Sequence, residues 1–170
     1  MQLTRESEYA LIGLSALAFE PVGSVVSLAA IAEANDLPRT FLAKIFQKLA
    51  RHGILSSERG RGRGYALARP ADSITMREIL EAVEGTGMFE QCLLWPVHCH
   101  DENPCPLHYR LKELVPPLRS LLEKITLSEY MAESPHAQGD LTLTRDSGEQ
   151  GRRGQGRRRA AERPRSDTPS

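Results

Sequence analysis

The stretch that decides the fold is residues 27–67, SLAAIAEANDLPRTFLAKIFQKLARHGILSSERGRGRGYAL. It opens with a short helix over 27–35, for which Ser27 is a suitable cap, and Pro38 follows a sharp break in the chain. Apolar residues then recur at i, i+3, i+4 and i+7 until Gly53, which predicts a second helix. Two short helices joined by such a turn form a helix-turn-helix.

A β-hairpin is expected directly after the second helix. Residues 54–57 and 65–67 read as two short strands, and the glycine-rich segment between them reads as their turn. A hairpin in this place makes a winged helix. Its glycines are expected to let the turn adopt positive φ and approach a surface closely, and its arginines suit the minor groove of DNA. The glycines are Gly60, Gly62 and Gly64, and the arginines are Arg59, Arg61 and Arg63.

Charge is unevenly distributed along the chain. The 22 basic and 22 acidic residues give no net charge, yet residues 38–69 hold eight basic residues against the single acid Glu58. The flanking stretches, 1–37 and 70–133, are acidic. A basic stripe in an acidic body fits phosphate contact, and a merely solvated basic face is the alternative.

The polar side chains of the second helix are candidates for DNA contact because they lie off its apolar stripe. Those near its N-terminal end are expected to meet base edges in the major groove. They are Arg39, Thr40 and Lys44, followed by Gln47. Lys48 is expected to meet phosphate or to lie on the surface. Together with the wing arginines they form the predicted DNA-binding set.

All three cysteines fall within the segment 89–108, spaced Cys-x6-Cys-x5-Cys-x2-His. They are Cys92, Cys99 and Cys105, and His108 is the last member of the pattern. Thiolates select zinc, copper(I) or iron–sulfur clusters, and an imidazole can complete four-coordination. Unrelated free thiols are the alternative, but their concentration in one segment favours a metal or a cluster.

Helices are also expected on both sides of this region. Residues 7–19 predict a first helix with Ser7 as its cap, and 73–85 predict a core helix that opens with a capping box of Thr75 and Glu78. After the cysteines, apolar residues follow a/d spacing. They are Leu107, Leu111, Leu114, Leu118, Leu121 and Ile125.

We expect this long helix to pair with a second copy across a two-fold axis, because one small domain covers little of its apolar face. Packing back onto its own domain is the alternative. Pro116 and Pro117 interrupt the pattern and are expected to kink or restart the helix.

The predicted fold is mainly α with a small β-hairpin wing. Residues 1–86 form a winged helix-turn-helix domain, 87–108 a cluster-binding loop, 109–133 a dimerisation helix and 134–170 a disordered basic tail. No apolar run is long enough to span a membrane, and the N-terminus lacks the order of a signal peptide. A cytoplasmic location is therefore expected, where thiols stay reduced.

The chain resembles the Rrf-two family of bacterial transcription regulators, the IscR, NsrR and RirA group, over residues 1–131. The resemblance rests on MQLTRESEYAL, SSERGRGRGYAL, ITMREILEAVEG and KITLSEYM, together with three cysteines before the long helix. It implies a dimer that binds palindromic operators. Many members hold a 2Fe–2S or 4Fe–4S cluster on the three cysteines and report iron, nitric oxide or redox state.

By this resemblance the three cysteines are cluster ligands and His108 completes the set. Glu8 stands where some members supply an N-terminal carboxylate, and it is the alternative fourth ligand. His98 and His100 are neighbouring competitors that we expect to be exposed. One departure is that six residues separate the first two cysteines, where IscR-like members usually have five.

The predicted function is a dimeric repressor whose binding to a double-stranded DNA operator is controlled by an iron–sulfur cluster, preferably 2Fe–2S. The signal would be iron, cluster supply, nitric oxide or redox state. The alternative is a DNA-binding protein with a structural zinc site and no sensing. An enzyme is not expected, because the chain has no Cys-x-x-Cys and no cofactor-binding glycine motif.

Overall fold

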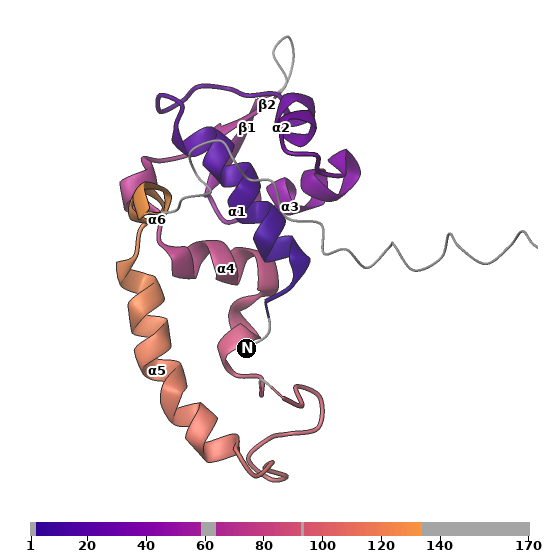
Figure 1. The fold of residues 1–170 in the computed structure, drawn as a ribbon, viewed down its shortest axis with the longest axis vertical. Helices are drawn as coiled ribbons and strands as arrows, with labels where there is room; N and C mark the ends of the chain where they lie inside the picture. The colour runs from indigo at the N-terminus through magenta and orange to yellow at the C-terminus, as the bar shows by residue number, and fades with distance from the viewer. Residues whose placement is uncertain (1–2, 59–63, 93, 134–170) are drawn as a thin grey trace, which may run out of the picture.

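The computed structural model describes residues 3–58, 64–92 and 94–133. A head of helices and one antiparallel hairpin occupies one end of the molecule, and a long helix and the cysteine loop extend away from it (Figure 1). This confirms the predicted fold class. The wing residues Arg59, Arg61 and Arg63 and the predicted tail from 134 onward lie outside the described residues.

The head is built on α1 (Arg5–Ala18), α2 (Leu28–Ala34) and α3 (Arg39–Arg51). The predicted stripe of α3 is buried, and its Phe46 lies so close to α1 that a Cβ on Gly13 would meet the ring at 2.6 Å. Ser27 caps α2 as predicted. Thr4 rather than Ser7 caps α1, because its Oγ1 accepts the Glu6 N–H at 3.2 Å.

The wing consists of β1 (Leu55–Glu58) and β2 (Gly64–Leu67), paired antiparallel. Val26 extends this sheet, since its N–H and C=O each bond the backbone of Tyr65 at 2.9 Å. A Cβ on Gly64 would lie 2.3 Å from the Val26 oxygen. Gly64 is not among the described glycines with positive φ, so close approach alone requires glycine at this position.

Helix α4 (Met76–Glu84) completes the head and packs on α1 and α3. The predicted capping box is confirmed: Thr75 Oγ1 accepts the Glu78 N–H at 3.2 Å, and Glu78 accepts the Thr75 N–H at 2.8 Å. Short 3₁₀ turns precede and follow α4: η1 (Ala71–Ser73) and η2 (Thr86–Phe89). The cysteine loop begins directly after η2.

The expectation of one helix over 109–133 is wrong. Helix α5 (His108–Lys124) ends before Ile125, and a separate α6 (Leu127–Glu133) turns back into the head, where Leu127 and Met131 are buried. The break follows from a second capping box, in which Thr126 exchanges hydrogen bonds with Glu129. Pro116 and Pro117 lie inside α5 and do not restart it.

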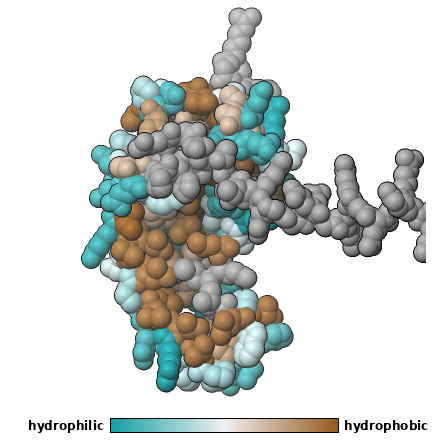
Figure 2. All heavy atoms as spheres, viewed as in Figure 1, coloured by the Kyte–Doolittle hydropathy of each residue, from teal (hydrophilic) through white to brown (hydrophobic). Residues whose placement is uncertain are grey.

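Helix α5 carries two apolar faces. One face packs on α4 and η2, with Val115, Leu118 and Leu122 against Leu80, Met88 and Phe89. The other face is exposed, and its large side chains are Leu107, Leu114 and Leu121, with 43%, 61% and 53% of their surface accessible. Figure 2 shows apolar side chains gathered in the lower half of the view, where α5 lies. One face of α5 therefore packs onto its own domain, and the other is the face that a second copy would cover.

Candidate metal centre and nucleic-acid interface

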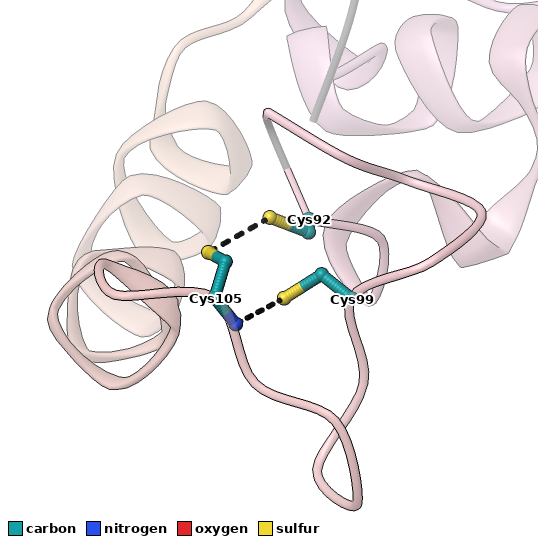
Figure 3. Close-up of side chains that lie close together, drawn as sticks. All are labelled: Cys92, Cys99 and Cys105. Atoms are coloured by element: carbon teal, nitrogen blue, oxygen red, sulfur yellow. Dashed lines mark hydrogen bonds between the residues drawn. The ribbon is translucent and has the colours of Figure 1, made fainter.

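The three predicted cysteine ligands meet between the loop and the start of α5. Their sulfur atoms all lie within 4.8 Å of one another, and Cys92 and Cys105 are separated by 3.8 Å (Figure 3). Cys99 and Cys105 are buried, whereas Cys92 is half-buried. The fold thus brings together three thiols, the first and last of which are thirteen residues apart in sequence.

His108, the first residue of α5, contacts one cysteine of this group. Its Nδ1 lies 3.1 Å from the Cys99 sulfur, and its Nε2 lies 2.8 Å from Asp101 Oδ1. The Cys105 N–H also donates to the Cys99 sulfur at 3.3 Å. Two contacts to the Cys99 sulfur therefore hold the loop against the N-terminal end of α5.

The local hydrogen bonds make the thiols unequal. Backbone N–H groups of Trp95 and Leu94 lower the pKa of the Cys92 thiol from 9.0 to about 7. The Cys105 N–H lowers the pKa of Cys99, but burial and the two neighbouring thiols outweigh it, so that this pKa is raised. Lys112 and then His108 lower the pKa of Asp101. Cys92 is therefore more easily ionised than Cys99.

The other predicted ligands are not in this group. Glu8 is exposed on α1 and makes no described contact with the cysteines, while His98 and His100 are exposed in the loop. Sequence reasoning missed Asp101, which contacts His108 from the loop. A lone aspartate seven residues before a histidine carries no recognisable spacing signal.

The donor set fits a metal. Two thiolates that bind one tetrahedral ion at about 2.3 Å lie roughly 3.8 Å apart, which is the separation of the Cys92 and Cys105 sulfurs. Cys99 and His108 form a second close pair at 3.1 Å. Four donors of the kind that bind zinc or iron are thus available as two pairs.

The predicted DNA-contact residues of α3 have two different surroundings. Arg39, Thr40, Lys44 and Gln47 are exposed. Arg39 and Gln47 line an open groove of about 580 Å³ between α3, the start of α2 and the base of the wing. The structure thereby brings two of the predicted residues to the wing.

Lys48 has internal partners instead. It forms an ion pair with Glu6 of α1 and donates to the Val83 carbonyl oxygen of α4 at 3.0 Å. Arg69, another member of the basic stripe, pairs with Glu78 at 2.6 Å. Both charges link elements within the head. Sequence reasoning could not find the partners of Lys48 because Glu6 and Val83 are 42 and 35 residues away from it.

Residues 3–133 match the Rrf2 family, which is described as "Iron-dependent Transcriptional regulator". The chain belongs to this family. Its Rrf2 relatives include the HTH-type transcriptional regulator IscR of Escherichia coli, 31% identical over 131 residues that cover 77% of this chain and 80% of that protein. The IscR of Cereibacter sphaeroides is 43% identical over 88 residues, or 51% of this chain and 57% of that protein.

Solved structures share the Rrf2 fold. CymR, the global cysteine regulator of B. subtilis, aligns with a TM-score of 0.64 over 79% of this chain and 98% of its own, at 22% identity. Family membership makes this chain a DNA-binding transcription regulator. None of the helices in the described residues is long and apolar enough to cross a membrane.

Proposed function

We propose that this Rrf2 protein is a dimeric repressor whose affinity for a DNA operator is controlled by an iron–sulfur cluster. The proposed ligands are Cys92, Cys99, Cys105 and His108. The observation that carries the proposal is the convergence of three sulfur atoms within 4.8 Å at the base of α5. Its place of action would be the cytoplasm, where thiols stay reduced.

The arrangement of the donors favours a 2Fe–2S cluster over 4Fe–4S. Each iron of a 2Fe–2S cluster takes two protein ligands, and the donors form two close pairs, Cys92 with Cys105 and Cys99 with His108. Mixed cysteine and histidine ligation is an established type. When bound, the cluster supplies bonds whose presence depends on iron supply, nitric oxide or redox state.

The DNA-binding surface we propose combines α3 with the wing. Arg39, Thr40, Lys44 and Gln47 are exposed on α3, and the groove beside Arg39 and Gln47 reaches the base of the wing. Arginine suits guanine edges and phosphate, which explains its use at both places. Arg59, Arg61 and Arg63 would add minor-groove or phosphate contacts at the wing tip. We leave Lys48 out of this surface because its ammonium group is engaged by Glu6 and Val83.

The exposed face of α5 would join two copies. Leu107, Leu114 and Leu121 recur every seven residues on one side of the helix and lie open to solvent. Burying one leucine side chain contributes about 1.5–3 kcal/mol, so a symmetric pair of such faces supplies a substantial driving force. A dimer of heads matches a palindromic operator.

The route from the cysteine site to the DNA-binding helix runs through the end of α4. Glu84 accepts hydrogen bonds from Thr4 N, Thr4 Oγ1 and Ser7 Oγ at 2.8, 2.8 and 2.6 Å, and Val83 accepts from Lys48 of α3. Gly85 and η2 follow at once and lead to Cys92. A shift of the loop would therefore act on the N-terminus of α1 and on α3 together.

The loop is also tied to the dimerisation helix. Phe89 of η2 packs on α5, with the Arg119 guanidinium 5.1 Å from its ring centre, and His108 and Cys105 lie at the start of α5. Ligation at the cysteines would thus fix α5 relative to the head. Because half-sites on one face of DNA lie about 34 Å apart, a small change in the separation of the two heads alters simultaneous docking.

The test is to purify the wild-type chain and its Cys92→Ala, Cys99→Ala and Cys105→Ala variants without oxygen. The wild type is expected to be coloured and to contain iron and sulfide, and each variant is expected to lose the visible absorbance. Glu102→Ala, which removes an exposed carboxylate from the same loop, is the control. An unchanged spectrum in the cysteine variants would reject the ligand assignment.

A structural zinc site is the second candidate. The 3.8 Å separation of Cys92 and Cys105 equals the spacing expected for two thiolates on one tetrahedral ion, and three cysteines with one histidine close the coordination of zinc. In that case the site would hold the loop in place without sensing. Colourless anaerobic protein with one zinc per chain would favour this function.

A further inference from the structure

A chain of polar contacts runs from the Cys99 sulfur through His108 to the exposed side of the loop. His108 Nδ1 faces Cys99 Sγ at 3.1 Å, and on the far side of the ring His108 Nε2 lies 2.8 Å from Asp101 Oδ1. Lys112 donates to the same Asp101 oxygen at 2.6 Å. The His108 side chain is only 11% exposed, whereas that of Asp101 is 67% exposed. The carboxylate thus reaches the imidazole from the solvent side.

The loop holds Asp101 in this position through its own backbone. His100 and Asn103 form a bridge, with the Asn103 N–H donating to the His100 oxygen at 3.0 Å. The Asn103 side chain also donates to the His98 oxygen at 3.2 Å. Asp101 lies inside this tight turn. Lys112 stands one helical turn after His108 on α5, so both partners of the carboxylate are on the same face of that helix.

These contacts decide which imidazole nitrogen carries the hydrogen. An ionised carboxylate has acceptors only, so His108 Nε2 must be the donor in the bond to Asp101. In a neutral imidazole the other nitrogen then carries a lone pair. That nitrogen, Nδ1, is the one that faces the Cys99 sulfur.

We propose that Asp101 is a positioning residue that holds His108 in the Nε2–H tautomer and aims its Nδ1 lone pair at the cysteine site. This inference deepens the proposed function and rests on it, because the lone pair serves a metal or cluster bound by the cysteines. A carboxylate behind a ligating histidine fixes the orientation of the ring and raises the basicity of the ligand. Lys112 keeps the carboxylate in place and ionised.

The role distinguishes His108 from the other histidines of the loop. His98 and His100 are exposed and have no described contact with a carboxylate or a sulfur. Glu102 is the neighbouring exposed carboxylate and has no described contact with His108. It provides a matched control with a similar charge at an adjacent position.

The first experiment reads the tautomer in the metal-free protein, so it does not depend on the proposed cluster. Nitrogen-15 spectra of the His108 ring would be recorded over a series of pH values, and the spectra of the neutral ring would be compared. Wild type, Asp101→Glu and Glu102→Ala are expected to show the Nε2–H form, and Asp101→Ala a mixture of both tautomers. The wild-type tautomer unchanged in Asp101→Ala would overturn the inference.

The second experiment measures what the tautomer does for metal binding, with cobalt(II) alone as the probe and a chelator as competitor. Asp101→Ala is expected to weaken binding about 10–100-fold, with Asp101→Glu restoring most of it. In a His108→Ala background the Asp101→Ala change should have no further effect, whereas a general loosening of the loop would weaken binding in both backgrounds.

The outcomes separate the two claims. Tight cobalt binding that is equal in wild type and Asp101→Ala would overturn the positioning role and leave the proposed site intact. No cobalt binding by the wild type would overturn the proposed metal site, and the inference with it. Circular dichroism of each variant checks the fold, which is expected to be retained because Asp101 is exposed.

Discussion

The head and the cysteine loop are held together in different ways. In the head, large side chains such as Phe46, Leu14 and Ile79 are fully buried. Among the described residues between 90 and 107, only Cys99 and Cys105 are buried, while Leu94, Trp95 and Val97 are exposed. The head is stabilised by packing, whereas the loop is held by contacts to sulfur and histidine. A change in bonding at the cysteines can therefore move the loop without unfolding the head.

The largest difference between the regions should appear when one aromatic side chain is removed from each. Phe46→Ala is expected to lower the free energy of unfolding by about 3–5 kcal/mol, because it leaves a cavity between α1 and α3. Trp95→Ala, at a loop residue that is 56% exposed, is expected to change it by about 0.5 kcal/mol or less. Urea unfolding of metal-free protein measures both. Comparable losses would show that the loop is packed as tightly as the head.

The next effect concerns the two faces of α5. Leu114→Glu places a charge on the exposed face and is expected to weaken dimerisation about 10–100-fold, with little effect on the unfolding of each chain. Glu113→Gln, at an exposed neighbour on the same helix, is the control. Sedimentation across a range of protein concentrations gives the dissociation constant. A dimer as strong as the wild type would mean that another surface joins the copies.

A smaller effect separates two basic residues of α3. Arg39→Ala is expected to weaken operator binding by about 1–3 kcal/mol if it reads a base, or to reduce the salt dependence by about one unit if it meets phosphate. Lys48→Met should leave the salt dependence unchanged and lower the unfolding free energy by about 1 kcal/mol, because it loses Glu6 and Val83. Fluorescence anisotropy at several salt concentrations tests both. A reduced salt dependence in Lys48→Met would place Lys48 on the DNA.

The smallest effect is a pH dependence within the loop. Because the pKa of Cys92 is lowered from 9.0 to about 7, its alkylation in metal-free protein should rise as the pH passes about 7. The raised pKa and burial of Cys99 should delay its reaction to higher pH. Mass spectrometry of labelled peptides measures each rate. A Cys92 midpoint near its ordinary value of 9.0 would show that the Trp95 and Leu94 backbone bonds do not form.

The lowered pKa of Cys92 also makes the free energy of unfolding depend on pH. The Cys92 thiolate is more stable in the folded chain than in the unfolded chain. Its contribution to the free energy of unfolding is therefore complete above about pH 9. That contribution is lost as the pH falls through about 7. The Cys92→Ala variant should lack this dependence.

Local patterns in the sequence predicted what local interactions decide. The apolar spacing of α3, the Ser27 cap and the Thr75 capping box depend on residues a few positions apart, and all are confirmed. The break before α6 has an equally local cause in Thr126 and Glu129, but the continuous apolar spacing concealed it. The proximity of the cysteines was predicted from their chemistry rather than from any packing pattern.

Contacts between distant segments could not be predicted in this way. Lys48 reads as a surface residue until Glu6 and Val83 are brought beside it by the packing of three helices. Asp101 is one of several acidic residues in its region, and only the turn of the loop brings it to His108. Such side chains acquire their roles from the assembled fold.

The most direct test of the central claim compares operator affinity in two states of the same protein. The chain would be purified without oxygen, and a palindromic operator selected from random DNA would be titrated with the cluster-loaded form and with protein stripped by a chelator. We predict affinities that differ by roughly 5–150-fold, the usual range for coupled sites. Equal affinities, with the loaded form retaining its colour and iron throughout, would contradict control of DNA binding by the cysteine site.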